Sequence, residues 1–227
     1  MKVITWNCNL KFKEKFELVN SHDPDICFIQ ECEKLKSDFF PNFKYFWTGR
    51  NENKGLGVLT KKNDFFVDET HNKDLINFLP IRSDDLKLLG VWSFNHRASK
   101  FGSEVSGNTI DAINFYKDWF GDNDERCIVA GDFNNSIIWD KKGNDNNFNN
   151  IDGHLVDLGF VSNYHKLKDE GMGKESYATF FHTKKESKKY HIDYIYSKNL
   201  NPLELKVGSY AEWISYSDHS PLIAELG

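Results

Sequence analysis

Residues 127 to 134 read Cys-Ile-Val-Ala-Gly-Asp-Phe-Asn, an apolar run that ends in polar residues. Such a run, bounded by glycine, is typical of a buried strand. Side chains alternate in an extended segment, so we expect Asp132 and Asn134 to project to one side and Phe133 into the opposite packing layer. The carboxylate could then orient or deprotonate a water, and the amide could donate to a phosphate oxygen. Taken alone, the motif fits a strand closed by two turn-forming residues equally well.

Further apolar runs of the same kind occur along the chain. Those predicted to be strands are 2–8, 26–30, 57–60, 88–95, 191–196 and 221–225. Phe12, Phe16 and Val19 recur at helical spacing, and residues 109–120 suggest a second amphipathic helix. Strands that alternate with helices early and then become denser indicate an α/β fold with packed sheets and outer helices. Residues 143–150, rich in Asn and Asp, are expected to form a surface loop.

Composition limits the class of protein. With 227 residues and 39% hydrophobic residues, the chain has enough apolar surface for a core, and no linker divides it, so we expect a single domain over residues 1–227. Its four cysteines show no Cys-x-x-Cys pattern and are expected to be reduced core thiols. The first residues leave no room for a signal peptide, and no run approaches the roughly 18 apolar residues of a membrane span, so we expect a cytoplasmic protein.

Polar side chains recur where the predicted strands end. They are Asn7, Glu31, His96, Asp132, Asn134, Asp193, Asp218 and His219. Strand ends are where α/β proteins place their sites, because the sheet fixes the geometry and the loops admit the ligand. Glu31 offers the hard oxygen that Mg²⁺ or Mn²⁺ prefers, although a glutamate after a strand also suits the start of a helix.

A carboxylate and an imidazole from two of these ends can form a pair. If Asp193 lies beside His219, it favours the doubly protonated ring, which can donate to a phosphate oxygen. His191, two residues before Asp193, is expected to project to the same side. Taken alone, His219 fits a structural histidine at least as well.

In this order, the motifs resemble the endonuclease/exonuclease/phosphatase superfamily, which has the deoxyribonuclease I-like fold. The segments that carry the resemblance are Trp6-Asn7, Gln30-Glu31, Asn95-His96, Gly131 to Asn134, Ile192 to Tyr194 and Ser217 to His219. The resemblance implies a four-layered sandwich of two packed mixed β-sheets flanked by helices. It also implies a hydrolase of phosphate esters that depends on Mg²⁺ or Mn²⁺.

The resemblance also implies roles for individual residues. Glu31, with Asn7 and Asp218 nearby, would bind the metal ion. Asp132 would orient or deprotonate the water, and Asn134 would hold the phosphate. His219, oriented by Asp193, would stabilise the phosphorane, with His96 on the other side of the phosphate. His191 and Arg97 are further candidates for phosphate contact, and no acidic partner for His96 is evident between residues 57 and 69.

The substrate is less determined by sequence. A nuclease that cleaves DNA or RNA is the first hypothesis, a phosphatase or phosphodiesterase for small-molecule or lipid phosphates the second, and a non-catalytic interaction domain the third. A formal net charge of −5 means that only a local patch could attract nucleic acid. The pairs Lys61-Lys62, Lys141-Lys142, Lys184-Lys185 and Lys188-Lys189 could line a phosphate track or simply be solvated surface, and no aromatic platform for base stacking is evident.

Overall fold

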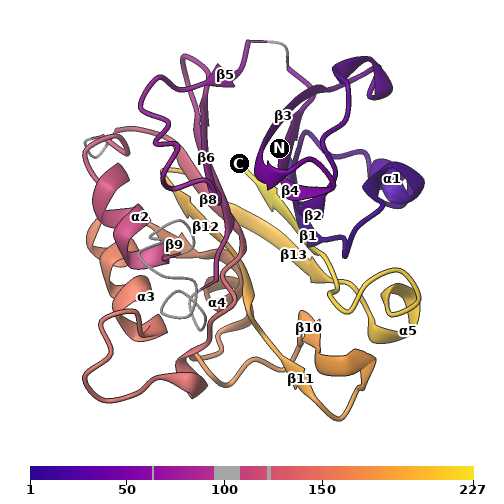
Figure 1. Ribbon diagram of the computed structural model, residues 1–227. Coiled ribbons are helices and arrows are strands. Elements are labelled where there is room, and N and C mark those ends of the chain that lie inside the picture. The colour runs from indigo at the N-terminus through magenta and orange to yellow at the C-terminus, as the bar shows by residue number, and fades with distance from the viewer. Residues whose placement is uncertain (63, 95–107, 122–123) are drawn as a thin grey trace.

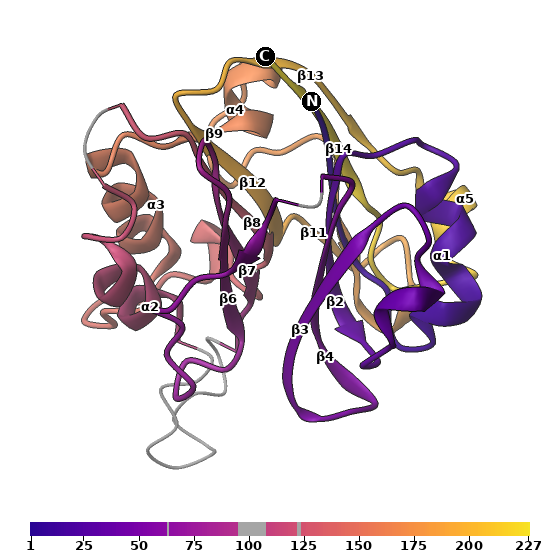
Figure 2. The same cartoon turned by 90° about the horizontal axis from the view of Figure 1, so that it is seen from above.

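Two six-stranded sheets pack face to face in the computed structural model, as Figure 2 shows. The structure describes residues 1–62, 64–94, 108–121 and 124–227. Buried apolar residues of both sheets share one core: Val3, Phe28 and Val58 come from the first sheet, and Leu88 and Ile128 from the second. Burial of this shared layer holds the sheets together.

The first sheet has the order β13-β14-β1-β2-β4-β3. Its strands are β1 (Lys2–Asn7), β2 (Ile26–Cys32), β3 (Lys44–Asn51), β4 (Lys54–Thr60), β13 (Pro202–Val207) and β14 (Leu222–Leu226). Strands β1 and β2 run parallel, and the other neighbours are antiparallel. Both termini therefore lie in or beside this sheet, as Figure 1 shows.

The second sheet has the order β5-β6-β7-β8-β12-β9. Its strands are β5 (Phe66–Val67), β6 (Phe78–Arg82), β7 (Lys87–Trp92), β8 (Cys127–Asp132), β9 (Val161–Ser162) and β12 (Asp193–Lys198). Here β7 and β8 are the parallel pair. A small antiparallel hairpin of β10 (Phe180–Phe181) and β11 (Lys189–Tyr190) lies outside both sheets.

Helices cover the outer faces of the two sheets. On the first sheet lie α1 (Phe12–Asn20) and α5 (Tyr210–Trp213), and on the second α2 (Thr109–Tyr116) and α3 (Phe148–Asp157). The remaining elements are α4 (Asn163–Lys168), η1 (Ser37–Phe39), η4 (Ile137–Trp139) and η5 (His182–Lys184). The result is the expected four-layered α/β sandwich, in the order helix, sheet, sheet, helix.

Several boundaries differ from the sequence expectations. The predicted loop 143–150 is wrong at its end, because α3 begins at Phe148. The cause is Asp140, whose carboxylate accepts from the backbone N–H groups of Phe148 and Asn149 at 2.7 and 3.0 Å and so satisfies the first turn of the helix. Strand β12 begins only at Asp193, so the alternation expected from His191 onward does not hold there.

The expectation for the cysteines is met. The four cysteines are free and buried. Among the helices of the described residues, none combines the length and the apolar character needed to cross a membrane.

Gly131 is required by the pairing of β7 with β8. Its φ is +154°, and a Cβ there would lie 1.8 Å from the carbonyl oxygen of Val91. We expect Gly131→Ala to lower the free energy of unfolding by at least about 3 kcal/mol, because neither backbone can move without breaking the ladder. Gly153→Ala is the matched control, because that glycine lies in α3 with open space around it. It should gain roughly 0.5–1 kcal/mol. Urea unfolding of the two variants checks both signs, and equal effects would contradict this account.

Candidate active site

Strand ends from both sheets meet at one edge of the sandwich. In the first sheet, Asn7 ends β1 and pairs with Gln30, next to Glu31 of β2. In the second sheet, Asp132 ends β8 and is the direct antiparallel partner of Asp193, the first residue of β12. The contact between sheets thus brings together polar groups that lie far apart in the sequence, such as Asn7 and Asp132.

Asp132 is the centre of this group. It has no exposed surface, and both of its carboxylate oxygens accept hydrogen bonds. Oδ1 accepts from the backbone N–H of Asn134 at 2.8 Å, and Oδ2 accepts from the side-chain amides of Asn7 and Asn134, each at 3.0 Å. Burial, with the nearby charge of Asp193, raises the pKa of Asp132 to about 7. A carboxyl group with this proton affinity is suited to accept a proton near neutral pH.

Asn134 reaches Asp132 through a tight turn. The prediction that these two side chains share a pocket is confirmed, but the strand ends at Asp132 and Asn134 has a left-handed φ of +46°. Asparagine tolerates this conformation better than most residues. Its amide also donates to the carbonyl oxygen of Ser93 at 2.9 Å, which fixes the turn against the end of β7. Phe133 packs into the core on the helix side, as expected.

Asp193 and His219 form a buried ion pair. Nδ1 of His219 lies 2.9 Å from Oδ2 of Asp193, with the two side chains 6% and 1% exposed. Burial alone would lower the pKa of His219, but the charges of Asp193 and Asp132 outweigh it and raise this pKa to about 10. The ring is therefore an imidazolium at neutral pH, as the sequence suggested.

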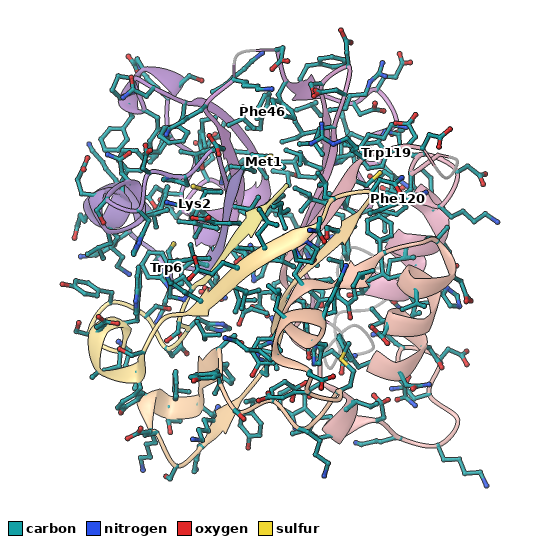
Figure 3. The ribbon with its side chains drawn as sticks, turned by 180° about the vertical axis from the view of Figure 1, so that it is seen from behind. Met1, Lys2, Trp6, Phe46, Trp119 and Phe120 are labelled. Carbon is teal, nitrogen blue, oxygen red and sulfur yellow. The ribbon has the colours of Figure 1, made fainter. Side chains whose placement is uncertain are left out.

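The loop that carries His219 is tied to the first strand. The indole N–H of Trp6 donates to the carbonyl oxygen of His219 at 2.9 Å, and the hydroxyl of Ser217 donates to that of Asn7 at 2.7 Å. The same hydroxyl accepts from the backbone N–H of His219 at 3.0 Å. Figure 3 shows Trp6 close to the yellow C-terminal segment. The bonds from Trp6 to His219 and from Ser217 to Asn7 join residues more than 200 positions apart and set the position of the imidazolium.

Thr179 is a positioning residue that the sequence did not reveal. Its hydroxyl accepts from the backbone N–H groups of Ile192 and Asp193 at 3.0 and 3.1 Å, while its carbonyl accepts from Ser220 at 2.8 Å. Thr179 therefore connects the two segments that carry the Asp193–His219 pair. A lone threonine outside any predicted strand carries no signal from which this could have been foreseen.

Glu31 points out of the sheet at a bulge. The register of β2 against β4 shifts between Gln30 and Cys32, and Glu31 has a φ of +60°. Its carboxylate lies 2.9 Å from the ammonium group of Lys54. A cationic group thus already lies where the family resemblance places a metal ion, and Glu31 is partly exposed and reachable from solvent.

A hard divalent cation fits Glu31 better than the neighbouring buried cluster. Ligand atoms of Asp132, Asp193 and His219 lie within 4.8 Å of one another. Oδ2 of Asp132 already accepts from two side-chain amides, however, and the doubly protonated ring of His219 cannot be a ligand. Oδ1 of Asn7 bonds the backbone N–H of Asn9 at 3.1 Å and remains a potential ligand, since an amide oxygen has two lone pairs.

The other predicted site residues differ in their placement. Asp218 is partly exposed, and its charge helps to raise the pKa of His219. His191 is buried, with its ring 4.5 Å from that of Tyr164 and its Nδ1 2.8 Å from the carbonyl oxygen of Tyr177. Burial lowers its pKa, so its ring is neutral at pH 7. His96 and Arg97 lie outside the described residues.

Comparisons with solved structures support the fold. The 3'-5' exonuclease NExo from Neisseria meningitidis superposes with a TM-score of 0.73 at 19% identity, over 99% of each chain. A 3' phosphatase NExo from Neisseria, bound to a product DNA hairpin, gives 0.76 at 18% identity over 100% of this chain and 99% of that chain. An AP endonuclease from Archaeoglobus fulgidus gives 0.73 at 14% identity, over 99% and 98%. No curated protein sequence matches the chain.

The sequence model of one family covers almost the whole chain. It matches residues 4–219, a span that begins in β1 and ends at His219. The segments that supply Asn7, Glu31, Asp132, Asp193 and His219 all lie within this match. The chain therefore belongs to the Endonuclease/Exonuclease/phosphatase family.

Proposed function

We propose that this protein is a divalent-metal-dependent phosphodiesterase that cleaves nucleic acid. The observation that carries the proposal is the buried group of Asp132, Asp193 and His219, whose ligand atoms lie within 4.8 Å. It sets a proton acceptor with a pKa of about 7 beside an imidazolium with a pKa of about 10. Two titratable groups with opposite tasks side by side are typical of acid–base chemistry.

In the proposed reaction, Asp132 orients the attacking water and accepts its proton as the water oxygen bonds to phosphorus. The ester P–O bond opposite the water breaks, and the leaving oxygen takes a proton from solvent. His219 donates from Nε2 to a phosphate oxygen, because Asp193 occupies its Nδ1 side. This donor is fixed before the reaction and meets the negative charge on the phosphoryl oxygens in the transition state. The amide of Asn134 holds the carboxylate of Asp132 in position, since its two N–H groups donate to Asp132 and to the carbonyl oxygen of Ser93.

Glu31, with Asn7 and Asp218, would hold Mg²⁺ or Mn²⁺. When bound, the ion would act as a Lewis acid that polarises the phosphoryl group. Ammonium groups such as that of Lys54 must then release Glu31, which is feasible because Lys54 is 41% exposed. We assign no phosphate contact to His191, since its ring is buried against Tyr164 and neutral.

Nucleic acid is favoured as the substrate because of family membership and because the structural neighbours include enzymes named for DNA processing. One of them is named a 3' phosphatase, so terminal phosphates are a second candidate substrate. The two candidates need the same catalytic groups and differ only in what lies beyond the phosphate.

We expect purified protein with Mg²⁺ or Mn²⁺ to cleave labelled oligonucleotides, and EDTA to abolish the cleavage. Asp132→Ala and His219→Gln should each lower the rate by roughly 10²- to 10⁴-fold, because each removes a group that moves or donates a proton. The control is Asp157→Ala, an exposed carboxylate at the end of α3. The measurement is the initial rate on single-stranded DNA, duplex DNA, RNA and a 3'-phosphorylated strand.

The result also decides between the alternatives. Activity confined to the 3'-phosphorylated strand would identify a phosphatase. A protein that binds Mn²⁺ and leaves every substrate intact would be a non-catalytic interaction domain, and the proposal would be wrong.

The pKa values of the buried histidines His191 and His219 should be shifted in opposite directions. In metal-free protein we expect His219 to remain doubly protonated at pH 8, since its pKa is raised to about 10, and His191 to be neutral at pH 7, since its pKa is lowered. Because the pKa of His219 lies above its ordinary 6.5, its pair stabilises the fold fully below about pH 6.5 and loses this contribution as the pH rises through 10. Imidazole nitrogen chemical shifts measure both rings.

Asp193→Asn is the matched variant for this titration. It keeps the size of the side chain and removes the charge that most strongly opposes the effect of burial on His219. The pKa of His219 should fall so that the ring is neutral at pH 8, and His191 should stay neutral at pH 8, because Asp193 is also one of the charges that raise its pKa. A His219 that is already neutral at pH 8 in the unmodified protein would refute the assigned role.

A further inference from the structure

A row of aromatic rings leads from the candidate active site to the surface. The ring of His219 lies 4.7 Å from that of Phe180, and Phe180 lies 6.3 Å from Tyr190 in a stacked arrangement. Tyr190 in turn lies 5.0 Å from Trp139. Trp139 ends the row with 38% of its surface exposed, which is unusual for so large a ring.

These rings belong to the elements that hold the catalytic groups. Trp139 ends η4, the first helical turn after Asp132 and Asn134. Phe180 lies in β10 and forms an isolated bridge with His219, and Tyr190 lies opposite Phe180 in β11. Figure 1 shows this hairpin beyond the ends of the two sheets. The position of Trp139 is therefore fixed relative to the imidazolium through a few direct contacts.

The turn of the same hairpin carries positive charge. Residues 182–189 are all exposed, and they include Lys184, Lys185, Lys188 and Lys189 with Glu186 as the only acidic residue. Two further exposed lysines, Lys141 and Lys142, follow Trp139 closely. In a protein with a net charge of −5, the four lysines of the turn, with one acidic residue among them, form a local basic surface on the hairpin that carries Phe180 and Tyr190.

We propose that Trp139 and the lysines of the hairpin turn form a binding surface for single-stranded nucleic acid next to the active site. An unpaired base would stack on the exposed part of the Trp139 ring, which packs against Tyr190. The lysines would contact the phosphates of neighbouring nucleotides. This inference rests on the proposed function and adds to it a preference for unpaired strands.

Stacking and charge together favour this occupant over others. A base inside a duplex has both faces covered by its neighbours, so away from the duplex ends an indole at the surface can stack only on an unpaired base. A basic surface suits phosphates and disfavours basic peptides. The combination of an aromatic ring with a lysine-rich track is the general means by which proteins bind single strands without sequence preference.

The experiment measures binding by fluorescence anisotropy in EDTA, so that no cleavage occurs. The probes are a labelled single-stranded oligothymidylate and a blunt duplex of equal length. We expect Trp139→Ala to weaken binding of the single strand roughly 5- to 100-fold, the equivalent of one stacked base, and to leave binding of the duplex almost unchanged. Trp139→Phe should restore most of the affinity. Phe115→Ala, which removes a 50% exposed ring on α2, is the control and should have no effect.

A second variant tests the lysines without altering the aromatic rings. Lys188→Ser/Lys189→Ser should reduce the slope of log affinity against log salt by about 1.4, since each phosphate contact to a single strand contributes about 0.7. Both lysines lie at or next to the exposed turn, so the fold should be retained, and circular dichroism checks this.

The outcomes separate this inference from the proposed function. If Trp139→Ala binds the single strand as tightly as the unmodified protein, or loses the duplex equally, the stacking surface is refuted, even if the protein cleaves nucleic acid. If the unmodified protein binds single strands through Trp139 but hydrolyses nothing, the surface stands and the catalytic proposal fails. An unchanged salt slope in the lysine variant would remove the hairpin turn from the surface.

Discussion

The site depends on one electrostatic constraint, namely that two buried carboxylates lie side by side. Asp132 and Asp193 are cross-strand partners with 0% and 1% exposure. Two like charges without solvent are costly, and a protein can relieve the cost by protonating one of them or by adding a cation. Here the pKa of Asp132 is raised to about 7, and the imidazolium of His219 lies against Asp193. Many of the surrounding contacts hold the ring of His219 beside Asp193.

The His219 ring reaches Asp193 only if the two sheets keep one fixed position relative to each other. His219 precedes β14 of the first sheet, whereas its partner Asp193 begins β12 of the second. The bonds from Trp6 and Ser217 fix the loop to β1, and Thr179 fixes it to the second sheet. A slip of one sheet against the other would separate the pair and leave a buried charge unpaired, so the polar network specifies the packing that the apolar core alone would leave adjustable.

The sequence predicted the architecture better than the details. Apolar runs identified the strands that begin or end at the site, because a buried strand must be continuous and short. The sequence analysis did not predict β3, β6 and β13, because Lys, Pro and Glu interrupt the apolar residues of these strands. The sequence analysis correctly predicted that Asp132 lies with Asn134 and Asp193 with His219. It could do so because these residues lie at the ends of predicted strands or beside them, in the order of the family motifs. The sequence could not place His191, because β12 begins only at Asp193, and periodicity carries no information about where a strand starts.

The aromatic row illustrates a second limit of reading a sequence. Trp139, Phe180, Tyr190 and His219 have no common spacing, and each taken singly looks like a core residue. They become one feature only because η4, the hairpin and the last loop all converge on the Asp132–Asp193 pair. The constraint that positions the imidazolium thereby also determines which side chains surround it. The elements that position the catalytic residues therefore also supply the surface proposed to bind the rest of the substrate. One arrangement of η4, the hairpin and the last loop serves both purposes.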